Sequence, residues 1–306
     1  MQKKNLIILI SPPASGKTFW IESFSAQVSE SVMVISPLRT LADECIEKWQ
    51  DKIKIFTPEE WLIRPLRSGI AIFDEFHLNY FWGDSFRPKM WEAFYQICHE
   101  AHTVVLMTAT LTEAMLREIH YFESEFDHMT LADFGNQKLR YQPKNYFKLS
   151  SKKMMEDFIF FGKKSGGTSL IFCPFRQEVS SLSKRLEQAG FRVWSCVGGE
   201  SHLMREKMRQ ESPPDFIVAT TVLSHGVNLP QICDIYFLYP VEDINFWIQM
   251  VARGGRRGED FYVYSLENPF NLEWHPWNNL LAITRARVRI EIKKFLRHAS
   301  EWFLKD

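Results

Sequence analysis

A short apolar run near the amino terminus, Leu6–Ile10, leads directly into the sequence SPPASGKT at residues 11–18. A buried strand that ends in a glycine-containing loop with Lys and Thr is typical of a phosphate-binding loop. In such a loop the backbone N–H groups surround an anion, Lys17 supplies a positive charge, and the Thr18 hydroxyl can bind Mg²⁺. Ser11 departs from the pattern, because glycine is usual at the first position. The loop predicts a nucleoside triphosphate ligand, without separating a kinase, a GTPase and a motor.

The expected nucleotide contacts in this loop are Pro13, Ala14, Ser15, Gly16, Lys17 and Thr18. A helix that begins near Lys17 would add the positive end of its dipole to the anion site.

Composition and charge limit the classes of protein that this chain can represent. Its 306 residues are enough for two domains of ordinary size, and its formal net charge is zero. Nucleic acid would therefore have to bind in a local groove, because no overall positive field attracts it. No apolar run approaches the about 18 residues of a membrane span. The five cysteines are scattered and never form a C-x-x-C pair, which favours reduced thiols over a zinc module.

We therefore expect a cytoplasmic protein with no membrane span. A cleaved signal peptide is rejected, because its removal would take away the strand that leads into the phosphate loop.

Short β-branched runs alternate with amphipathic stretches along the chain, and this alternation predicts parallel sheets covered by helices on both faces. In the first half the expected strands are 5–10, 31–36, 53–56, 70–74 and 103–108, and the expected helices are 17–29, 39–51, 58–66, 86–100 and 112–119. A polar stretch at 135–150 predicts a boundary. In the second half the expected strands are 169–174, 191–196, 215–221, 233–239 and 259–266, and the expected helices are 176–189, 202–211, 243–253 and 278–304.

The sequence Asp74-Glu75-Phe76-His77 closes the apolar strand at 70–74. A carboxylate at the carboxyl end of a strand beside a phosphate loop is placed to hold Mg²⁺, which we assign to Asp74 together with Thr18. Glu75 beside it can orient and deprotonate an attacking water. His77 connects this site to other parts of the protein, through Thr108 or Gln249, or it is an ordinary buried histidine; the sequence leaves both open.

These four residues resemble the D-E-x-H box of superfamily-2 helicases, and further motifs of that family follow in order. Ser36-Pro37-Leu38-Arg39-Thr40-Leu41-Ala42 is similar to the P-T-R-x-L-A element that grips a strand, and Thr57-Pro58-Glu59 stands where a second strand-contacting motif is expected. Thr108-Ala109-Thr110 matches the S/T-A-T motif. The resemblance implies two tandem RecA-like α/β domains, at 1–140 and 147–306, each a mostly parallel sheet covered by helices.

The second half carries the remaining motifs of this resemblance. Cys173-Pro174 with Arg176 is similar to the motif that opens the second domain, and Ala219-Thr220-Thr221 with Gly226-Val227-Asn228-Leu229-Pro230 is similar to T-x-x-x-x-x-G-x-D-x-P. Asn228 replaces the usual Asp. Gln249 to Arg256 fits Q-x-x-G-R-x-x-R, with Ala252 in place of Gly. The resemblance implies that Gly226 and Asn228 contact the nucleotide, and that Gln249, Arg253 and Arg256 act in hydrolysis.

Arg253 and Arg256 are spaced like neighbours on one helix face and lie in the other half from Lys17. As arginine fingers they would reach the γ-phosphate only when the two halves close on ATP, and such groups are worth about 10³–10⁵ in rate. A strand groove would hold backbone phosphates without reading sequence. Its expected residues are Pro37, Arg39, Thr40, Thr57, Thr110, Arg176 and Thr220.

The sequence therefore predicts a monomeric ATP-dependent helicase or translocase that uses ATP and Mg²⁺ on single-stranded nucleic acid, with a weak preference for DNA. Two alternatives stay open: a remodeller of a protein or nucleoprotein complex, and a nucleotide-gated binding module. Two interpretations stay open for the aromatic residues Trp82, Phe86 and Trp91: they stack on bases of a bound strand, or they belong to the hydrophobic core. The basic C-terminal helix packs on the second domain, and its charged face is solvated or contacts a partner protein.

Overall fold

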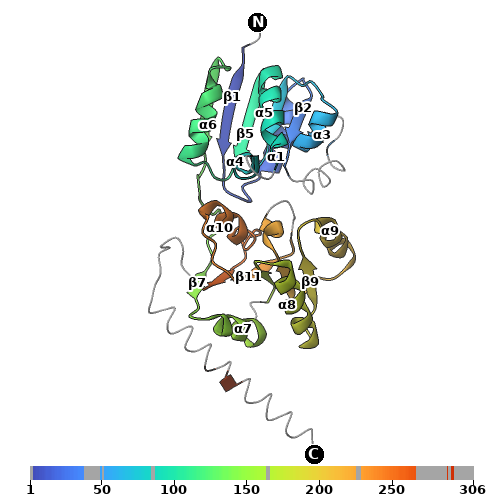
Figure 1. The fold of residues 1–306 in the computed structure, drawn as a ribbon, viewed down its shortest axis with the longest axis vertical. Coiled ribbons are helices and arrows are strands. Elements are labelled where there is room, and N and C mark those ends of the chain that lie inside the picture. Colours follow the sequence, from blue (N-terminus) through green and yellow to red (C-terminus); the bar gives the residue numbers. More distant parts are fainter. Residues whose placement is uncertain are drawn as a thin grey trace, which may run out of the picture. The chain divides into compact units, whose positions relative to one another are not determined.

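The structure is a computed structural model that describes residues 3–37, 49, 52–83, 87–162, 166–224, 229–266, 288, 291 and 292. The chain divides into two compact units, Met1–Arg140 and Tyr141–Asp306 (Figure 1). Each unit holds one six-stranded sheet, and all of the strand pairs recorded in both sheets are parallel. This confirms the predicted class of two α/β units.

The first sheet has the order β3-β2-β4-β5-β1-β6. Its strands are β1 (Asn5–Ile10), β2 (Val32–Ile35), β3 (Ile53–Phe56), β4 (Ile70–Phe73), β5 (Thr103–Thr108) and β6 (His128–Asp133). The sequence predicted the first five and missed β6. Nearly every residue of β6 is exposed, so this edge strand lacks the apolar run that marks its neighbours.

Five helices of the first unit lie within the described residues. They are α1 (Lys17–Gln27), α3 (Pro58–Ile63), α4 (His77–Gly83), α5 (Lys89–Glu100) and α6 (Glu113–Glu123). The predicted helix at 39–51 falls almost entirely outside the described residues. Helix α4 was not predicted, because it begins directly at the end of the D-E-x-H sequence and is only seven residues long.

Alternate residues of strand β1 pack on opposite faces of the first sheet. Leu6, Ile8 and Ile10 belong to a core with Phe94 of α5 and Ile119 of α6. On the other face, Leu9 packs in a second core that includes Ile21 of α1. Helices therefore cover both faces, as the burial of the inner strands β2, β4 and β5 requires.

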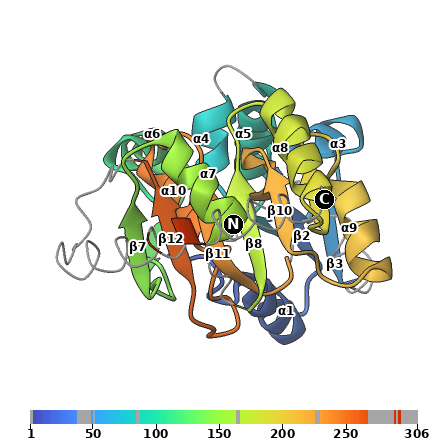
Figure 2. The same ribbon diagram turned by 90° about the horizontal axis from the view of Figure 1, so that it is seen from below.

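The second sheet has the order β7-β12-β11-β8-β10-β9 (Figure 2). Its strands are β7 (Asn145–Lys148), β8 (Thr168–Phe172), β9 (Val193–Cys196), β10 (Phe216–Ala219), β11 (Ile232–Phe237) and β12 (Tyr262–Ser265). Its helices are α7 (Lys152–Phe161), α8 (Arg176–Gln188), α9 (Ser201–Gln210) and α10 (Ile244–Val251), with a 3₁₀ turn, η1, at Thr221–Ser224. The sequence missed β7 and α7, because β7 lies inside the polar stretch interpreted as a boundary.

Of the predicted C-terminal helix at 278–304, only residues 288, 291 and 292 are described, and all three are helical. Val288 and Ile292 are 57% and 54% exposed. The packing of the rest of this helix lies outside the described residues and stays a prediction. No helix within the described residues is long and apolar enough to span a membrane.

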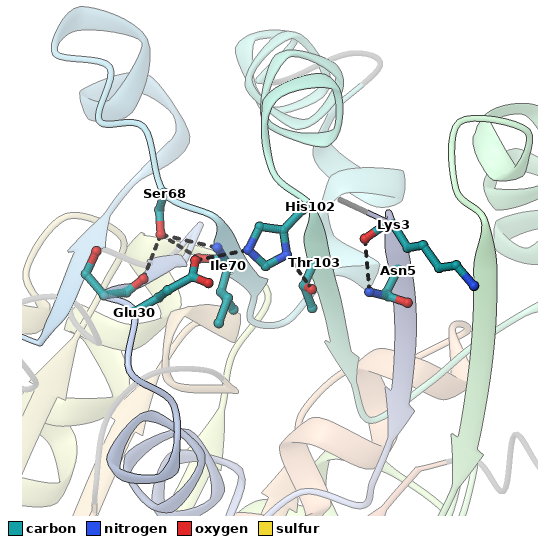
Figure 3. Close-up of polar contacts among 8 residues, drawn as sticks. Lys3, Asn5, Glu30, Ser68, Ile70, His102 and Thr103 are labelled. Atoms are coloured by element: carbon teal, nitrogen blue, oxygen red, sulfur yellow. Dashed lines mark hydrogen bonds and ion pairs between the residues drawn. The ribbon is translucent and has the colours of Figure 1, made fainter. Parts of the chain in front are cut away.

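Polar contacts fix the amino ends of the strands in the first sheet (Figure 3). His102 lies between Glu30, with Nε2 3.0 Å from Oε2, and Thr103 at the start of β5, with Nδ1 3.0 Å from Oγ1. The Ser68 hydroxyl donates to the Ile70 carbonyl at 2.9 Å, at the start of β4. A Cβ at Gly69 would lie 2.1 Å from Glu30 Oε2 and 2.4 Å from His102 Nε2, so a larger residue there would displace this pair. These contacts lie at the amino ends of β4 and β5, whereas the phosphate loop and Asp74–His77 follow the carboxyl ends of β1 and β4.

Candidate nucleotide-binding site

The loop after β1 has the backbone conformation that a bound anion needs. Ala14 and Gly16 have φ values of +61° and +95°, and α1 begins at Lys17, directly after Gly16. A left-handed conformation at a residue such as Ala14 is uncommon and is typical of functional loops. The Ser15 hydroxyl donates to the Ser11 hydroxyl at 3.0 Å. Ser11 thus uses its side chain to brace the loop at the position where glycine is usual.

The first amides of α1 have no partner inside the helix and lie at the positive end of its dipole. The loop and this helix start form a concave donor surface of the type that binds phosphate.

The two carboxylates of the D-E-x-H box lie against the phosphate loop. The Lys17 Nζ is 3.8 Å from Glu75 Oε1, and both side chains are largely buried, at 11% and 15% exposure. Glu75 has a φ of +50°, which strains the backbone at the point where β4 turns into α4. The Asp74 amide donates to the Ile35 carbonyl at 2.9 Å, so the box is fixed to the neighbouring strand. In the sequence, Lys17 of the loop is 57 residues from Asp74 of the box. The structure brings Lys17, Asp74 and Glu75 together at one site.

Asp74 is held in a state that suits a cation ligand. It is 6% exposed, and among the described residues no hydrogen-bond partner is recorded for its Oδ1. Burial and the adjacent negative charge of Glu75 raise the pKa of Asp74 to about 7, against the opposing effect of Lys17. A buried carboxylate oxygen without a partner carries a large desolvation cost that a bound cation offsets. Asp74 and the Thr18 hydroxyl are oxygen ligands of the kind that Mg²⁺ prefers.

His77 connects the carboxylates to the Thr108-Ala109-Thr110 sequence. Its Nδ1 lies 3.2 Å from Thr108 Oγ1 and 3.5 Å from Glu75 Oε2. The Thr108 hydroxyl donates its one proton to the Thr110 carbonyl at 2.7 Å and accepts from the Thr110 amide at 3.1 Å. Since that proton is already used, His77 Nδ1 must be the donor to Thr108. Of the two partners that the sequence suggested for His77, the structure places Thr108 there.

The two predicted strand-contacting motifs are held together by a residue that the sequence analysis did not single out. Arg87 donates from Nε to Glu59 at 2.8 Å, donates from a second nitrogen to the same carboxylate, and donates to the Pro37 carbonyl. Its guanidinium also lies 6.0 Å from the centre of the Trp82 ring. The only sequence signal was its place in the Arg87-Pro88 pair that precedes α5.

Two of the residues expected to touch a strand, Thr57 and Thr110, are buried in this structure. The Thr57 hydroxyl accepts from the Glu60 amide at 3.3 Å, and Glu60 accepts from the Thr57 amide at 3.0 Å, which is a capping box for α3. Thr57 is 6% exposed and Thr110 is fully buried. Neither hydroxyl is presented at the surface, and the contact of these side chains with a strand stays a prediction. Arg39 and Thr40 lie outside the described residues.

In the second unit, Gln249 is on α10 and is 4% exposed, with its Nε2 lacking a recorded partner among the described residues. The spacing of Arg253 and Arg256 predicted that they share one face of a helix. This prediction is wrong, because helix α10 ends at Val251, before both residues. They lie in the turn that follows, where a Cβ at Gly254 would be 2.2 Å from the Phe261 ring and Gly255 has a φ of +65°. Arg256 Nε donates to the Ala252 carbonyl at 3.0 Å.

The other predicted residues of this unit lie at carboxyl ends of strands or next to them. Arg176 begins α8 after β8 and donates to the Gly198 carbonyl at 2.8 Å, and Thr220 follows β10 directly. Gly226 and Asn228 lie outside the described residues, and their nucleotide contacts stay predictions.

Parts of the chain are similar in sequence to known helicases. Residues 150–258 match the family model described as "Helicase conserved C-terminal domain". The probable ATP-dependent DNA helicase RecS of Bacillus subtilis is 20% identical over 289 residues, which is 88% of this chain and 57% of RecS. The ATP-dependent helicase wrn-1 of Caenorhabditis elegans is 29% identical over 119 residues, 36% of this chain and 11% of wrn-1. The chain thus spans only part of the length of these relatives.

The fold is shared with a solved structure, S. cerevisiae Dbp5 bound to RNA and ADP BeF3. The TM-score is 0.66 at 18% sequence identity, over 92% of this chain and 83% of that chain. An identity this low shows the RecA-like fold alone. The motif series in both units is similar to that of superfamily-2 helicases, and residues 150–258 match a helicase C-terminal domain.

Proposed function

We propose that this protein is an ATP-dependent nucleic-acid helicase or single-strand translocase. The observation that carries the proposal is the group formed by Lys17, Asp74 and Glu75: a lysine on a phosphate-binding loop, 3.8 Å from one carboxylate, with a second carboxylate buried beside it. A protein that binds phosphate without hydrolysing it needs only the loop and the lysine. The buried acidic pair adds a cation ligand and a base, which are the requirements of hydrolysis.

The proposed roles follow from the chemistry of each side chain. Lys17 and the loop amides bind the β- and γ-phosphates of ATP, while Thr18 and Asp74 hold Mg²⁺, which neutralises phosphate charge. Glu75 orients the attacking water and accepts its proton. In its strained backbone conformation the Glu75 side chain is directed at Lys17, so the base and the phosphate-binding charge lie at one place.

Gln249, Arg253 and Arg256 are proposed to complete the site from the second unit when ATP is bound. Guanidinium groups supplied at that moment stabilise the charge of the transition state, and closure and release would then alternate with each turnover. Because hydrolysis depends on closure, a strand held by both units is gripped and released in the same cycle.

Single-stranded nucleic acid is the proposed track, and DNA is the first candidate because the match to RecS covers most of the chain. The segment from Pro230 to Gln249 contains only β11, a short loop and most of α10, so no strand-splitting hairpin is inserted there. Translocation is therefore the minimal activity, with duplex separation as its consequence in a suitable substrate. The four described cysteines are free and buried, which fits the proposed cytoplasmic location.

A titration of ATPase activity with poly-dT and with poly-U tests the proposal. We expect hydrolysis in the absence of a strand to be slow, and one or both polymers to raise kcat. Lys17→Ala should abolish activity under all conditions and serves as the control for contaminating ATPases. An unchanged rate with both polymers would remove the helicase proposal and leave a remodeller that responds to a protein partner.

A further inference from the structure

The last residues of the first unit, 133–140, form a segment that we call the exit segment, because the chain leaves the unit through it. It begins at the end of β6, where the Phe134 amide donates to the Ile10 carbonyl at 2.8 Å and so extends the pairing with β1. The Asp133 carboxylate then accepts from the amides of Gly135 and Asn136, at 2.7 and 2.8 Å. These bonds turn the chain sharply, toward the two loops that border the nucleotide site.

One side of the exit segment contacts the phosphate loop. Arg140 donates from Nη1 to the Ala14 carbonyl at 2.7 Å, although the two residues are 126 positions apart. Gly135 has a φ of +135°, and a Cβ there would lie 3.1 Å from Cγ of Pro12. The backbone of the exit segment thus approaches the loop as closely as glycine allows, and an arginine reaches the centre of the loop.

The carbonyl that Arg140 holds belongs to the strained residue of the loop. Ala14 has a φ of +61°, and on the other side of the same peptide group the Ser15 amide donates to the Pro12 carbonyl at 3.2 Å. The Ala14–Ser15 peptide is therefore fixed at both of its polar atoms. Its orientation sets the direction of the following amides, which lead into α1 and face the phosphate position.

The other side of the exit segment contacts the loop that carries Thr108-Ala109-Thr110. The Asn136 side chain accepts from the Leu111 amide and donates to the Leu111 carbonyl, both at 2.8 Å. The Gln137 amide donates to the Ala109 carbonyl at 3.3 Å, with Gln137 itself at a φ of +53°. One short segment thus joins the phosphate loop, the loop connected to His77, and the boundary between the units.

We propose that Arg140 is a positioning residue for the phosphate loop, and that the exit segment couples nucleotide binding to the start of the second unit. The proposal rests on the proposed function only in taking an adenine nucleotide as the ligand. A phosphate group that fixes the amides of the loop also fixes the Ala14 peptide, and therefore strengthens the bond to Arg140. Because coupling is reciprocal, the exit segment tightens when nucleotide binds, and loss of Arg140 weakens nucleotide binding.

The test compares Arg140→Gln with Lys138→Gln, which removes a charge from the same exposed segment. Binding of Mg²⁺–ADP is measured by calorimetry, so the readout does not depend on hydrolysis. A charge-assisted hydrogen bond at an exposed site predicts an about 3- to 10-fold weaker binding for Arg140→Gln. Lys138→Gln should bind as wild type does, and Arg140→Lys, which keeps a positively charged donor, should recover part of the loss. If Arg140→Gln did not fold, Arg140→Lys would be compared with Lys138→Gln in its place.

Amide hydrogen exchange over residues 134–141 provides the second readout. In the wild type, Mg²⁺–ADP should slow exchange in this segment, and in Arg140→Gln at saturating ADP the slowing should disappear. If Arg140→Gln and Lys138→Gln bind Mg²⁺–ADP with equal affinity, the proposal is overturned. It is also overturned if ADP still slows amide exchange over residues 134–141 in Arg140→Gln. Failure of the proposed function looks different, because the wild-type protein itself would then bind neither ADP nor ATP.

Discussion

The Nδ1 atom of His77 lies 3.2 Å from the hydroxyl oxygen of Thr108, and both side chains are buried. This contact joins the box that holds the candidate base, Glu75, to the loop of Thr108-Ala109-Thr110. The Thr108 hydroxyl has all of its hydrogen-bonding positions used, by His77 and by both backbone polar groups of Thr110. A displacement of His77 would therefore disturb the hydrogen bonds between the Thr108 hydroxyl and the Thr110 backbone.

Replacing Thr108 by valine should separate ATP binding from strand stimulation. Valine keeps the volume but removes the hydroxyl, which leaves His77 Nδ1 and the Thr110 amide without this partner at a cost of about 1–3 kcal/mol. We expect the KM for ATP to change less than twofold and the strand-stimulated kcat to fall about tenfold, as about 1.4 kcal/mol in a barrier implies. The measurement is steady-state ATPase activity with and without poly-dT.

Thr103→Val is the matched control, since Thr103 starts the same strand, β5, at the edge opposite the site. Its hydroxyl contacts His102 at 3.0 Å and nothing in the nucleotide site. Equal kinetics for the two variants would contradict the role given to Thr108.

Glu75→Gln should trap ATP. The amide keeps the shape of the side chain but cannot accept a proton, and removal of a general base typically lowers the rate about 10²–10⁴-fold. Affinity for ATP should stay equal or rise, because the negative charge 3.8 Å from Lys17 is removed. Single-turnover hydrolysis and equilibrium binding check the two expectations, with the exposed Glu92→Gln of α5 as the control. A normal single-turnover rate would exclude Glu75 as the base.

The parts of the site that sequence could predict are those that depend on neighbours in the chain. The turn from β1 through Gly16 into α1 is local, and so is the placement of Asp74 and Glu75 at the end of β4. Arg87 and Arg140 were missed because their partners are 28 to 126 residues away, and such contacts leave no trace in spacing.

Local sequence also misled where tertiary packing decides the backbone. The spacing of Arg253 and Arg256 suits a helix, but Gly254 and Gly255 lie so close to the Phe261 ring that the chain forms a turn there instead. Strand β6 was missed for a related reason: it is exposed, and its pairing with β1, not an apolar pattern, makes it a strand.

Arg87→Lys should loosen both strand-contacting motifs. Lysine cannot form the two-pronged bond to Glu59 and also reach the Pro37 carbonyl, so one of these contacts is lost. We expect about 1 kcal/mol less stability, because the pair is only partly buried at 19% and 30% exposure, and several-fold weaker binding of single strands. Arg185→Lys, which alters a more exposed pair with Glu156, should change either quantity little. Equal effects of the two substitutions would contradict this role.

The same pair predicts a pH dependence with a definite sign. Burial opposes the charge on Glu59, but the hydrogen bond and charge of Arg87 outweigh it and hold the pKa of Glu59 below its ordinary value of 4.5. A lowered folded-state pKa stabilises the protein above the unfolded-state value, and the contribution disappears as the pH falls through the folded-state pKa. The stability difference between wild type and Arg87→Lys should therefore be full at neutral pH and shrink below about pH 4. Urea unfolding at a series of pH values measures it.

Arg256→Ala should slow hydrolysis without weakening the first unit's hold on the nucleotide. Lys17, Asp74 and Glu75 are all in the first unit, so binding of Mg²⁺–ADP should change little. If Arg256 stabilises the transition state, kcat falls by about 10³-fold or more. Arg257→Ala removes an exposed arginine from the same turn and controls for the loss of charge. If kcat fell equally in both variants, the cause would be the loss of positive charge from the turn and not a specific role of Arg256. An unchanged kcat for Arg256→Ala would exclude Arg256 as an arginine finger.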